Sequence, residues 1–224
     1  SDWTVDLRAV RQNYALRSFD YGNDPAASGT WRYGLNNSLT IETHAESTRN
    51  LITGGAGAVY LIGNQGGVVT AAASHSRNGS QEGSLFNFGY SWRSNQFNFA
   101  VEGTRTQNEY RDVAALNGAP APDRSGRVSL GYGIEQLGSF GVSYLQLRYP
   151  AEQATRYVNA NWSRSVGGRG SFSVSFNQDL NNRRNSSVFV GFTWALDGNV
   201  STSAGVQHDR ERTIYTATAQ HTAP

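Results

Sequence analysis

The stretch from Leu85 to Trp92 reads Leu-Phe-Asn-Phe-Gly-Tyr-Ser-Trp, and the stretch from Phe97 to Glu102 reads Phe-Asn-Phe-Ala-Val-Glu. Large apolar or aromatic side chains recur at every second position of both stretches, and mostly small or polar side chains stand between them. Because successive side chains of a β-strand point to opposite faces, this alternation predicts two strands, each with one apolar face. The short break at Arg93–Asn95 predicts that the strands form a hairpin.

The same alternation recurs along most of the chain. It is clear at Val5/Leu7/Ala9, Trp31/Tyr33/Leu35, Leu39/Ile41/Thr43, Phe140/Val142/Tyr144, Val158/Ala160/Trp162, Phe172/Val174/Phe176 and Val188/Val190/Phe192/Trp194. Weaker strands are expected near 55–62, 68–76, 127–133, 199–207 and 213–220. The total is about fourteen strands, each near the ~9–11 residues with which a tilted strand crosses a bilayer. We therefore expect an all-β fold, an antiparallel transmembrane β-barrel that is either complete or a segment of a larger barrel.

The predicted connections alternate between short and long, as in outer-membrane barrels with short periplasmic turns and longer extracellular loops. Short turns are expected at Asn36–Asn37, Gly63–Gly67, Arg93–Asn95, Ile134–Gly138, Val166–Gly170 and Leu196–Asn199. Longer connections are expected at Arg17–Ser28, Ser47–Thr53, Arg77–Gly83, Thr106–Gly126, Pro150–Ala154 and Asp179–Asn185. A soluble β-sandwich, whose strands also alternate, has no reason to show this pattern of connections. Residues 1–224 are expected to form a single barrel domain or barrel segment, with no plug, N-terminal or C-terminal periplasmic domain.

Composition narrows the possible functions. The 224 residues include no Cys and no Lys, because all 19 basic residues are Arg, so thiol and lysine chemistry are excluded. A net charge of +2 gives no basic groove for nucleic acid. The mean hydropathy is -0.53 and no apolar run approaches the ~18 residues of a spanning helix, which excludes a helical membrane protein. A membrane barrel stays possible, because only alternate residues of its strands face lipid.

Three tryptophans support a membrane boundary. Trp92, Trp162 and Trp194 take the last apolar position of their strands, beside predicted short turns. Tryptophan is enriched at the membrane–water interface, where its ring meets lipid and its N–H meets water. The alternative is that these rings belong to the core of a soluble sandwich.

The polar positions of the strands predict a wall facing a wet lumen. Glu42, His44 and Glu46 share one strand face, in a pattern that could serve acid–base chemistry or hold a metal. That face lies opposite Ile41, so a lumen requires polar residues there without any chemistry. We expect no catalytic, cofactor-binding or metal site and no enzyme activity. The residues expected to line the lumen are Asp6, Arg8, Arg32, Glu42, His44, Glu46, Asn87, Asn98 and Glu102.

Two glycine pairs do not form a nucleotide-binding motif. Gly55-Ala56-Gly57 and Gly131-Tyr132-Gly133 both lack the third glycine of a dinucleotide fingerprint, and both fall in predicted strands. They are expected to allow close strand packing or bends.

Several phrases of the sequence resemble the outer-membrane usher proteins of chaperone–usher pilus systems. The resemblance lies in Asp6–Gly22, Trp31–Leu35, Leu39–Thr40 and Ala45–Glu46, and it continues in Asn108–Asp112, Gly138–Tyr144, Asn161–Ser165 and Ser187–Phe192. It implies a barrel wall in the bacterial outer membrane, through which pilus subunits delivered by a periplasmic chaperone are secreted and assembled. It implies no cofactor and no enzymatic step.

The resemblance is incomplete, and other functions stay open. An usher also has a plug domain and periplasmic domains, and its barrel has more strands than this sequence predicts. The expected partners are therefore membrane lipid and, if the chain is part of a full usher, pilus subunits and a chaperone. The principal alternative is a self-closing, porin-like channel related to an usher. An outer-membrane enzyme and a soluble β adhesin are the other classes.

Overall fold

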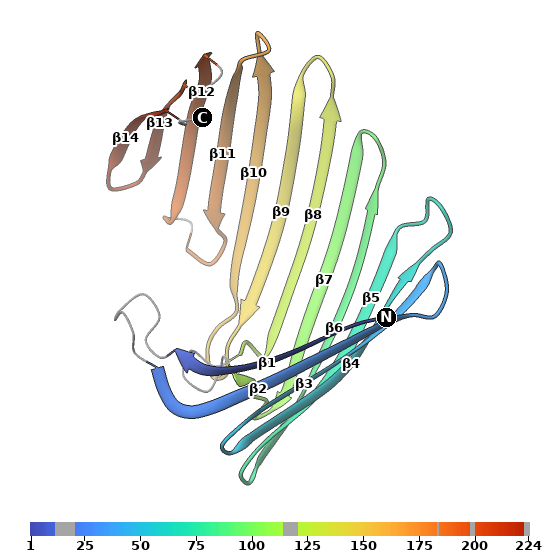
Figure 1. The fold of residues 1–224 in the computed structure, drawn as a ribbon. Coiled ribbons are helices and arrows are strands. Elements are labelled where there is room, and N and C mark those ends of the chain that lie inside the picture. The colour runs from blue at the N-terminus through green and yellow to red at the C-terminus, as the bar shows by residue number, and fades with distance from the viewer. Residues whose placement is uncertain (12–20, 114–120, 183, 198–199, 222–224) are drawn as a thin grey trace. The chain divides into compact units, whose positions relative to one another are not determined.

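The computed structural model describes residues 1–11, 21–113, 121–182, 184–197 and 200–221. In these residues fourteen antiparallel strands form one sheet and follow one another in chain order (Figure 1). The predicted all-β class with about fourteen strands is therefore confirmed. The strands are β1 (Asp2–Arg11), β2 (Tyr21–Gly34), β3 (Leu39–Thr48), β4 (Leu51–Leu61), β5 (Val68–Asn78), β6 (Gln81–Arg93), β7 (Phe97–Asn108), β8 (Arg124–Ile134), β9 (Gly138–Arg148), β10 (Thr155–Val166), β11 (Gly170–Asp179), β12 (Ser186–Asp197), β13 (Val200–Asp209) and β14 (Thr213–His221).

The chain divides into two compact units. The first comprises Ser1–Trp92, Val101–Gly126 and Leu147–Ala154, and the second comprises Arg93–Ala100, Arg127–Gln146 and Thr155–Pro224. The four strands from β6 to β9 contribute residues to both units. The expectation of one domain over 1–224 stays a prediction. No helix of the described residues is long and apolar enough to cross a membrane.

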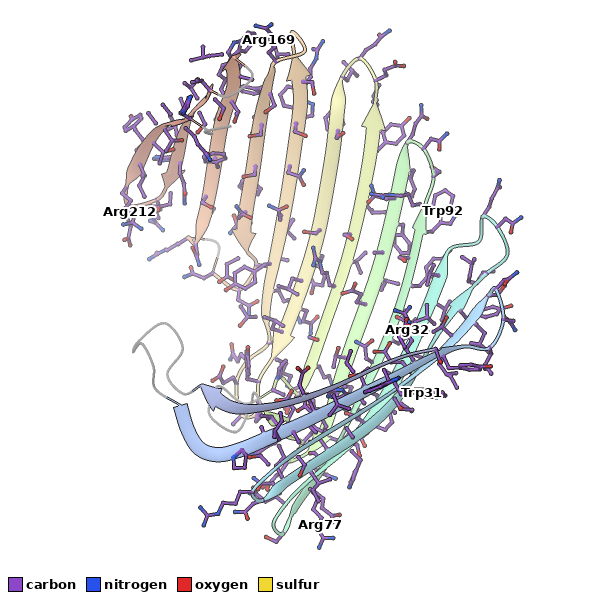
Figure 2. All side chains as sticks on the ribbon, in the orientation of Figure 1. Trp31, Arg32, Arg77, Trp92, Arg169 and Arg212 are labelled. Atoms are coloured by element: carbon purple, nitrogen blue, oxygen red, sulfur yellow. The ribbon has the colours of Figure 1, made fainter. Side chains whose placement is uncertain are left out.

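The register of the first unit separates an apolar face from a polar face. Residues directly opposite each other in neighbouring strands lie on the same face. One continuous row joins Trp3, Trp31, Thr43, Ala56, Ala73 and Phe86 from β1 to β6. The adjacent row on the other face joins Arg32, Glu42, Gly57, Ala72 and Asn87. Trp31 and Arg32, both labelled in Figure 2, are consecutive and therefore lie on opposite faces of β2.

The second unit shows the same division. Its apolar face carries the row Trp162, Val174, Val190, Val206 and Tyr215 across β10–β14. Its other face carries Ser163, Ser173, Gly191, Gly205 and Thr216 in the adjacent row. Period-two alternation therefore predicts the faces correctly in both units.

The apolar face is largely uncovered. Its exposed large side chains include Val5, Leu7, Tyr33, Phe86, Phe88, Leu130, Phe140, Val142, Val190 and Phe192. Leu51 is the only large hydrophobic side chain of the described residues that is fully buried. A soluble sandwich would bury its apolar face against a second sheet, and water-soluble monomers rarely expose large contiguous apolar patches. Within the described residues the sheet therefore has no core of the kind that a soluble sandwich requires.

The tryptophans stand beside short turns, as predicted. The Trp92 Nε1–H donates to the carbonyl of Gln65 at 2.6 Å, and the Trp162 Nε1–H donates to the carbonyl of Leu137 at 2.7 Å. The Trp194 ring packs on Gly170, its partner on the neighbouring strand. Each ring thus packs on the apolar face, and two of them satisfy a turn carbonyl.

The predicted alternation of connections is correct only in part. The connection over residues 109–123 is long, as expected, but residues 149–154 and 180–185 form connections no longer than residues 62–67, where a short turn is expected. The longer connections expected at Ser47–Thr53 and Arg77–Gly83 are wrong. β3 pairs with β4 up to Thr48 and Leu51, which leaves a turn of only two residues. β5 and β6 also meet across two residues, and Gly79 takes the positive φ of 63° that a tight hairpin turn favours.

The first connection is also shorter than expected. Tyr21–Ser28 belongs to β2 rather than to a loop spanning Arg17–Ser28. Pro25, which lies within the connection expected at Arg17–Ser28, stands opposite Ala9 beside a register shift in β1. Proline is tolerated in a sheet at such irregularities because the ladder is already interrupted there.

Candidate functional site

The polar face of the first unit brings together most of the residues expected to line a lumen. Asp6 pairs with Ser28, which pairs with Glu46, and Arg32 pairs with Glu42. Asn87 lies in the same row as Glu42, three strands away. These positions therefore share one face, and their exposure to a lumen stays a proposal.

The remaining predicted residues are placed only in part. Glu102 shares the face of Asn87, because its Cγ lies 3.8 Å from a Cβ built on Gly89 of β6. Asn98 belongs to the second unit, where its side chain lies against Gly131. The backbone of Arg8 pairs with Ala26, and its side chain lies outside what the structure describes.

A chain of hydrogen bonds runs across this face from β2 to β3. The Thr30 Oγ1 lies 3.0 Å from the His44 Nδ1, and the His44 Nε2 lies 2.7 Å from the Glu46 Oε1. In a neutral imidazole, Nε2–H donates to the carboxylate and Nδ1 accepts from the hydroxyl. In this tautomer the Glu46 carboxylate orients the ring.

Residues 109–113, which we call the strap, follow β7 and are bonded to the polar face. The Thr53 Oγ1 donates to the Arg111 carbonyl at 3.1 Å, and the Arg111 N–H donates to the Ser76 Oγ at 2.9 Å. The Val113 N–H donates to the Glu46 Oε2 at 3.2 Å. All three bonds use the backbone of the strap, so they depend on its path and not on its side chains.

Two further contacts fix the first part of the strap. The Glu109 N–H donates to the Glu82 carbonyl at 3.2 Å. The Ser74 Oγ donates to the Tyr110 hydroxyl at 2.8 Å. The strap is therefore bonded to β3, β4, β5 and β6.

The strap requires small residues beneath it. A Cβ built on Gly83 would overlap the backbone N and Cα of Tyr110, so no larger residue fits without movement of the strap. Ser76 is 1% exposed and Thr53 is 3% exposed, and both hydroxyls bond to the strap. Buried hydroxyls of this kind are costly unless they are paired, and the strap supplies the partners.

Burial also affects the hydroxyl of Tyr110, a residue of the strap. Burial raises its pKa above the ordinary value, and the carboxylates of Asp112 and Glu46 raise it further, while the hydrogen bond from Ser74 acts in the opposite direction. Because the folded-state pKa is raised, the neutral phenol stabilises the strap below the ordinary tyrosine pKa of about 10. That contribution is lost as the pH rises through the raised pKa.

A cavity of about 450 Å³ lies between the strap and the sheet. Gly55, Gly57 and Ala72 of the sheet line it together with Glu42 and with Asp112 of the strap. Cβ atoms built on the two glycines would lie 2.6 Å from Ser74 Cβ and 3.1 Å from Ala72 Cβ, which confirms the predicted close strand packing at Gly55-Ala56-Gly57.

The Thr30–His44–Glu46 arrangement has the order of a catalytic triad, in which a hydroxyl, an imidazole and a carboxylate bond in sequence. Catalysis also needs preorganised donors aimed at a developing oxyanion. The second carboxylate oxygen of Glu46 is bonded to the strap, so this carboxylate has a structural role. Among the described residues, no group of three or more His, Asp or Glu side chains is arranged to hold a metal ion.

We expect Glu42, His44 and Glu46 to have a structural role and no catalytic role. Glu42→Gln, His44→Asn and Glu46→Gln combined should leave folding intact, because each new amide keeps an oxygen acceptor at its position. A fluorophosphonate probe for activated hydroxyls should not label the wild type, and metal titration should show no tight binding. Labelling of Thr30, or tight binding of a metal by the wild type and not by the triple variant, would contradict this expectation.

The sequence did not reveal the strap. The resemblance covers Asn108–Asp112, and the sequence predicts a long connection at Thr106–Gly126, but neither observation indicates that the segment folds onto the sheet. The available signal was the set of small residues on the polar positions of β4–β6, including Gly55, Gly57 and Gly83. Glycine within strands marks places where another backbone approaches closely.

Comparison with known proteins supports the fold. No protein-family model matches the chain, and no curated protein matches it in sequence. The solved structure of the P pilus usher (PapC) translocation pore matches it with a TM-score of 0.63 at 18% identity, over 97% of this chain. This chain spans 47% of the length of that pore chain. At this identity the likeness shows a shared fold.

A mutant form of the Rh. blastica porin is similar over 96% of this chain and 98% of its own, with 8% identity and a TM-score of 0.49. That similarity is too low to support an argument about this chain.

Proposed function

We propose that the chain forms part of the wall of a bacterial outer-membrane translocation pore of the usher type. In this proposal the pore secretes and assembles pilus subunits that a periplasmic chaperone delivers. The observation that carries it is the uncovered apolar face of a single antiparallel sheet whose fold is similar to that of the solved P pilus usher pore. Lipid would cover that face, and the polar face would line the lumen.

Strand length and aromatic placement support the membrane part of the proposal. The strands span 9 to 14 residues, enough to cross the hydrocarbon layer when tilted. In the second unit Trp162 packs with Phe140 and Phe172, at ring-centroid distances of 6.3 and 5.6 Å. Clustered rings beside short turns fit a periplasmic interface.

The width expected of a fourteen-stranded pore favours a larger barrel wall, which strands outside this chain complete. Barrels of ~8 strands have a filled interior, and ~16–18 strands leave an aqueous channel for small solutes. A folded domain of ~100 residues has a radius of gyration of about 13 Å and could not pass a fourteen-stranded pore. If the chain instead closes by itself, it is the porin-like channel of the alternative proposal, and a narrow one.

Secretion and conductance together test the proposal. The chain, within its parent reading frame, is expressed with a genetically linked chaperone and pilus subunit in a bacterium lacking other ushers. Subunits are expected on the cell surface only when the parent is present. Small, stable single-channel steps from the isolated chain, without secretion by the parent, would favour the porin-like alternative. Large open-pore conductance from this chain alone would contradict the strand-count argument.

A further inference from the structure

Three arginines lie at the strand ends of the first unit next to the longest connection, residues 109–123. Arg105 is near the end of β7, Arg124 begins β8 and Arg148 ends β9. All three belong to the first unit, and all three side chains are exposed. The pairing of β7 with β8 and of β8 with β9 decides whether the three arginines lie side by side.

Arg105 and Arg124 stand opposite each other. The Thr106 N–H donates to the Asp123 carbonyl at 2.9 Å, which pairs the residues just beyond the two arginines. Cβ atoms built on Gly103 and Gly126 approach the carbonyls of Ser125 and Glu102, at 3.9 and 4.0 Å, as expected if these glycines are opposite each other. The same register places Arg105 opposite Arg124.

Arg124 and Arg148 also stand opposite each other. β8 and β9 each have 11 residues and are joined by the three residues between Ile134 and Gly138. The Leu137 N–H donates to the Ile134 carbonyl at 3.0 Å, which closes this turn. If Ile134 and Gly138 are opposite each other beside this turn, the antiparallel register pairs Arg124, the first residue of β8, with Arg148, the last residue of β9.

The three arginines lie on the apolar face. Arg124 alternates in phase with Val128 and Leu130, and Arg148 alternates in phase with Val142, all of which are exposed apolar residues. Among the described residues none of the three arginines forms an ion pair. Like charges directly opposite each other destabilise a sheet, so this row favours an anion that binds to it.

The guanidinium groups fit phosphate. Arginine binds phosphate oxygens through paired, charge-assisted hydrogen bonds. Neighbouring strands are ~4.8 Å apart, so the row extends about 10 Å, which matches a headgroup carrying more than one phosphate. We propose that Arg105, Arg124 and Arg148 bind the phosphates of a multiply phosphorylated lipid headgroup. The inference rests on the proposed membrane location of the apolar face.

The experiment measures lipid binding to the chain folded in phosphatidylcholine nanodiscs. The probe is lipid A with two phosphates, and phosphatidylglycerol with one phosphate is the comparison. Lipid A is expected to bind more tightly. Arg105→Gln, Arg124→Gln and Arg148→Gln combined should weaken its binding on the order of 100-fold, since each arginine near a membrane contributes ~1 kcal/mol with anionic lipid.

A matched triple, Arg93→Gln, Arg169→Gln and Arg210→Gln, removes the same charge from other positions and should retain binding within about threefold of the wild type. Equal losses in both triples would overturn the inference. Inorganic phosphate that displaces lipid A at equal concentration would show a site for any anion and would also overturn it.

The single variant Arg124→Gln, expected to weaken binding about fivefold, keeps the inference testable if the triple variant does not fold. Unchanged lipid A binding by this folded variant would contradict the central place of Arg124 in the row. A wild type that folds in plain buffer and does not enter phosphatidylcholine bilayers would contradict the proposed membrane location. A folded wild type with no preference for lipid A would contradict only the lipid site.

Discussion

Replacing Val142 with arginine should lower the free energy of unfolding from lipid by about 2–4 kcal/mol. Val142 lies near the middle of β9 on the apolar face and is 50% exposed. If lipid covers that face, the guanidinium must enter the hydrocarbon layer near its midplane, where a charge is costly. The change is measured by denaturant titration of the chain in lipid vesicles.

Ser143→Arg is the matched control for this prediction. Ser143 is the next residue of β9, so it has nearly the same depth and points to the polar face. The arginine at position 143 should remain hydrated in a lumen, and its cost should be much smaller. Equal losses of unfolding free energy in the two variants would show that the assignment of the faces is wrong.

The second large effect is expected at Gly83. Gly83→Ala places a methyl group where the backbone of Tyr110 lies, and the strap must move away from the sheet. Overpacking of this kind costs about 2 kcal/mol, which increases the open population of the strap on the order of 30-fold. The strand itself should tolerate alanine, since Gly83 lies within β6 and is not among the glycines with positive φ.

Ser76→Cys reports on the strap, because Ser76 is 1% exposed beneath it and residues 1–224 contain no cysteine. Labelling of this cysteine by a maleimide should be slow in the Ser76→Cys protein and much faster when Gly83→Ala is added. Gly54→Ala is the matched control, since a Cβ at Gly54 has no neighbour within 4 Å. Slow labelling in the Gly83→Ala protein, or equally fast labelling in the control, would contradict the tethering of the strap.

The faces of the sheet could be predicted from the sequence because they follow from a local rule. Successive side chains of a strand point to opposite faces, so apolar residues at every second position all lie on one face. Phe86 and Phe88 therefore place Asn87 on the other face. Turn lengths were less predictable. Ser47–Thr53 and Arg77–Gly83 are polar enough for loops, and only the pairing of the strands shows that they continue as ladders.

The strap could not be predicted because its bonds join residues far apart in sequence. Thr53 and Arg111 are 58 residues apart, and Glu46 and Val113 are 67 apart. A threonine or serine at a polar strand position gives no local sign of its partner. The Thr30–His44 bond was missed for the same reason, since the sequence shows Glu42, His44 and Glu46 together but not the residue across the strand.

The central claim is that lipid covers the apolar face, and heat modifiability of the folded chain tests it most directly. The chain is refolded into detergent or lipid vesicles and, separately, into plain buffer, and gel mobility is compared before and after heating. We predict a compact, faster-migrating form that appears only with detergent or lipid and disappears on heating. A folded, monodisperse chain in plain buffer would contradict the claim.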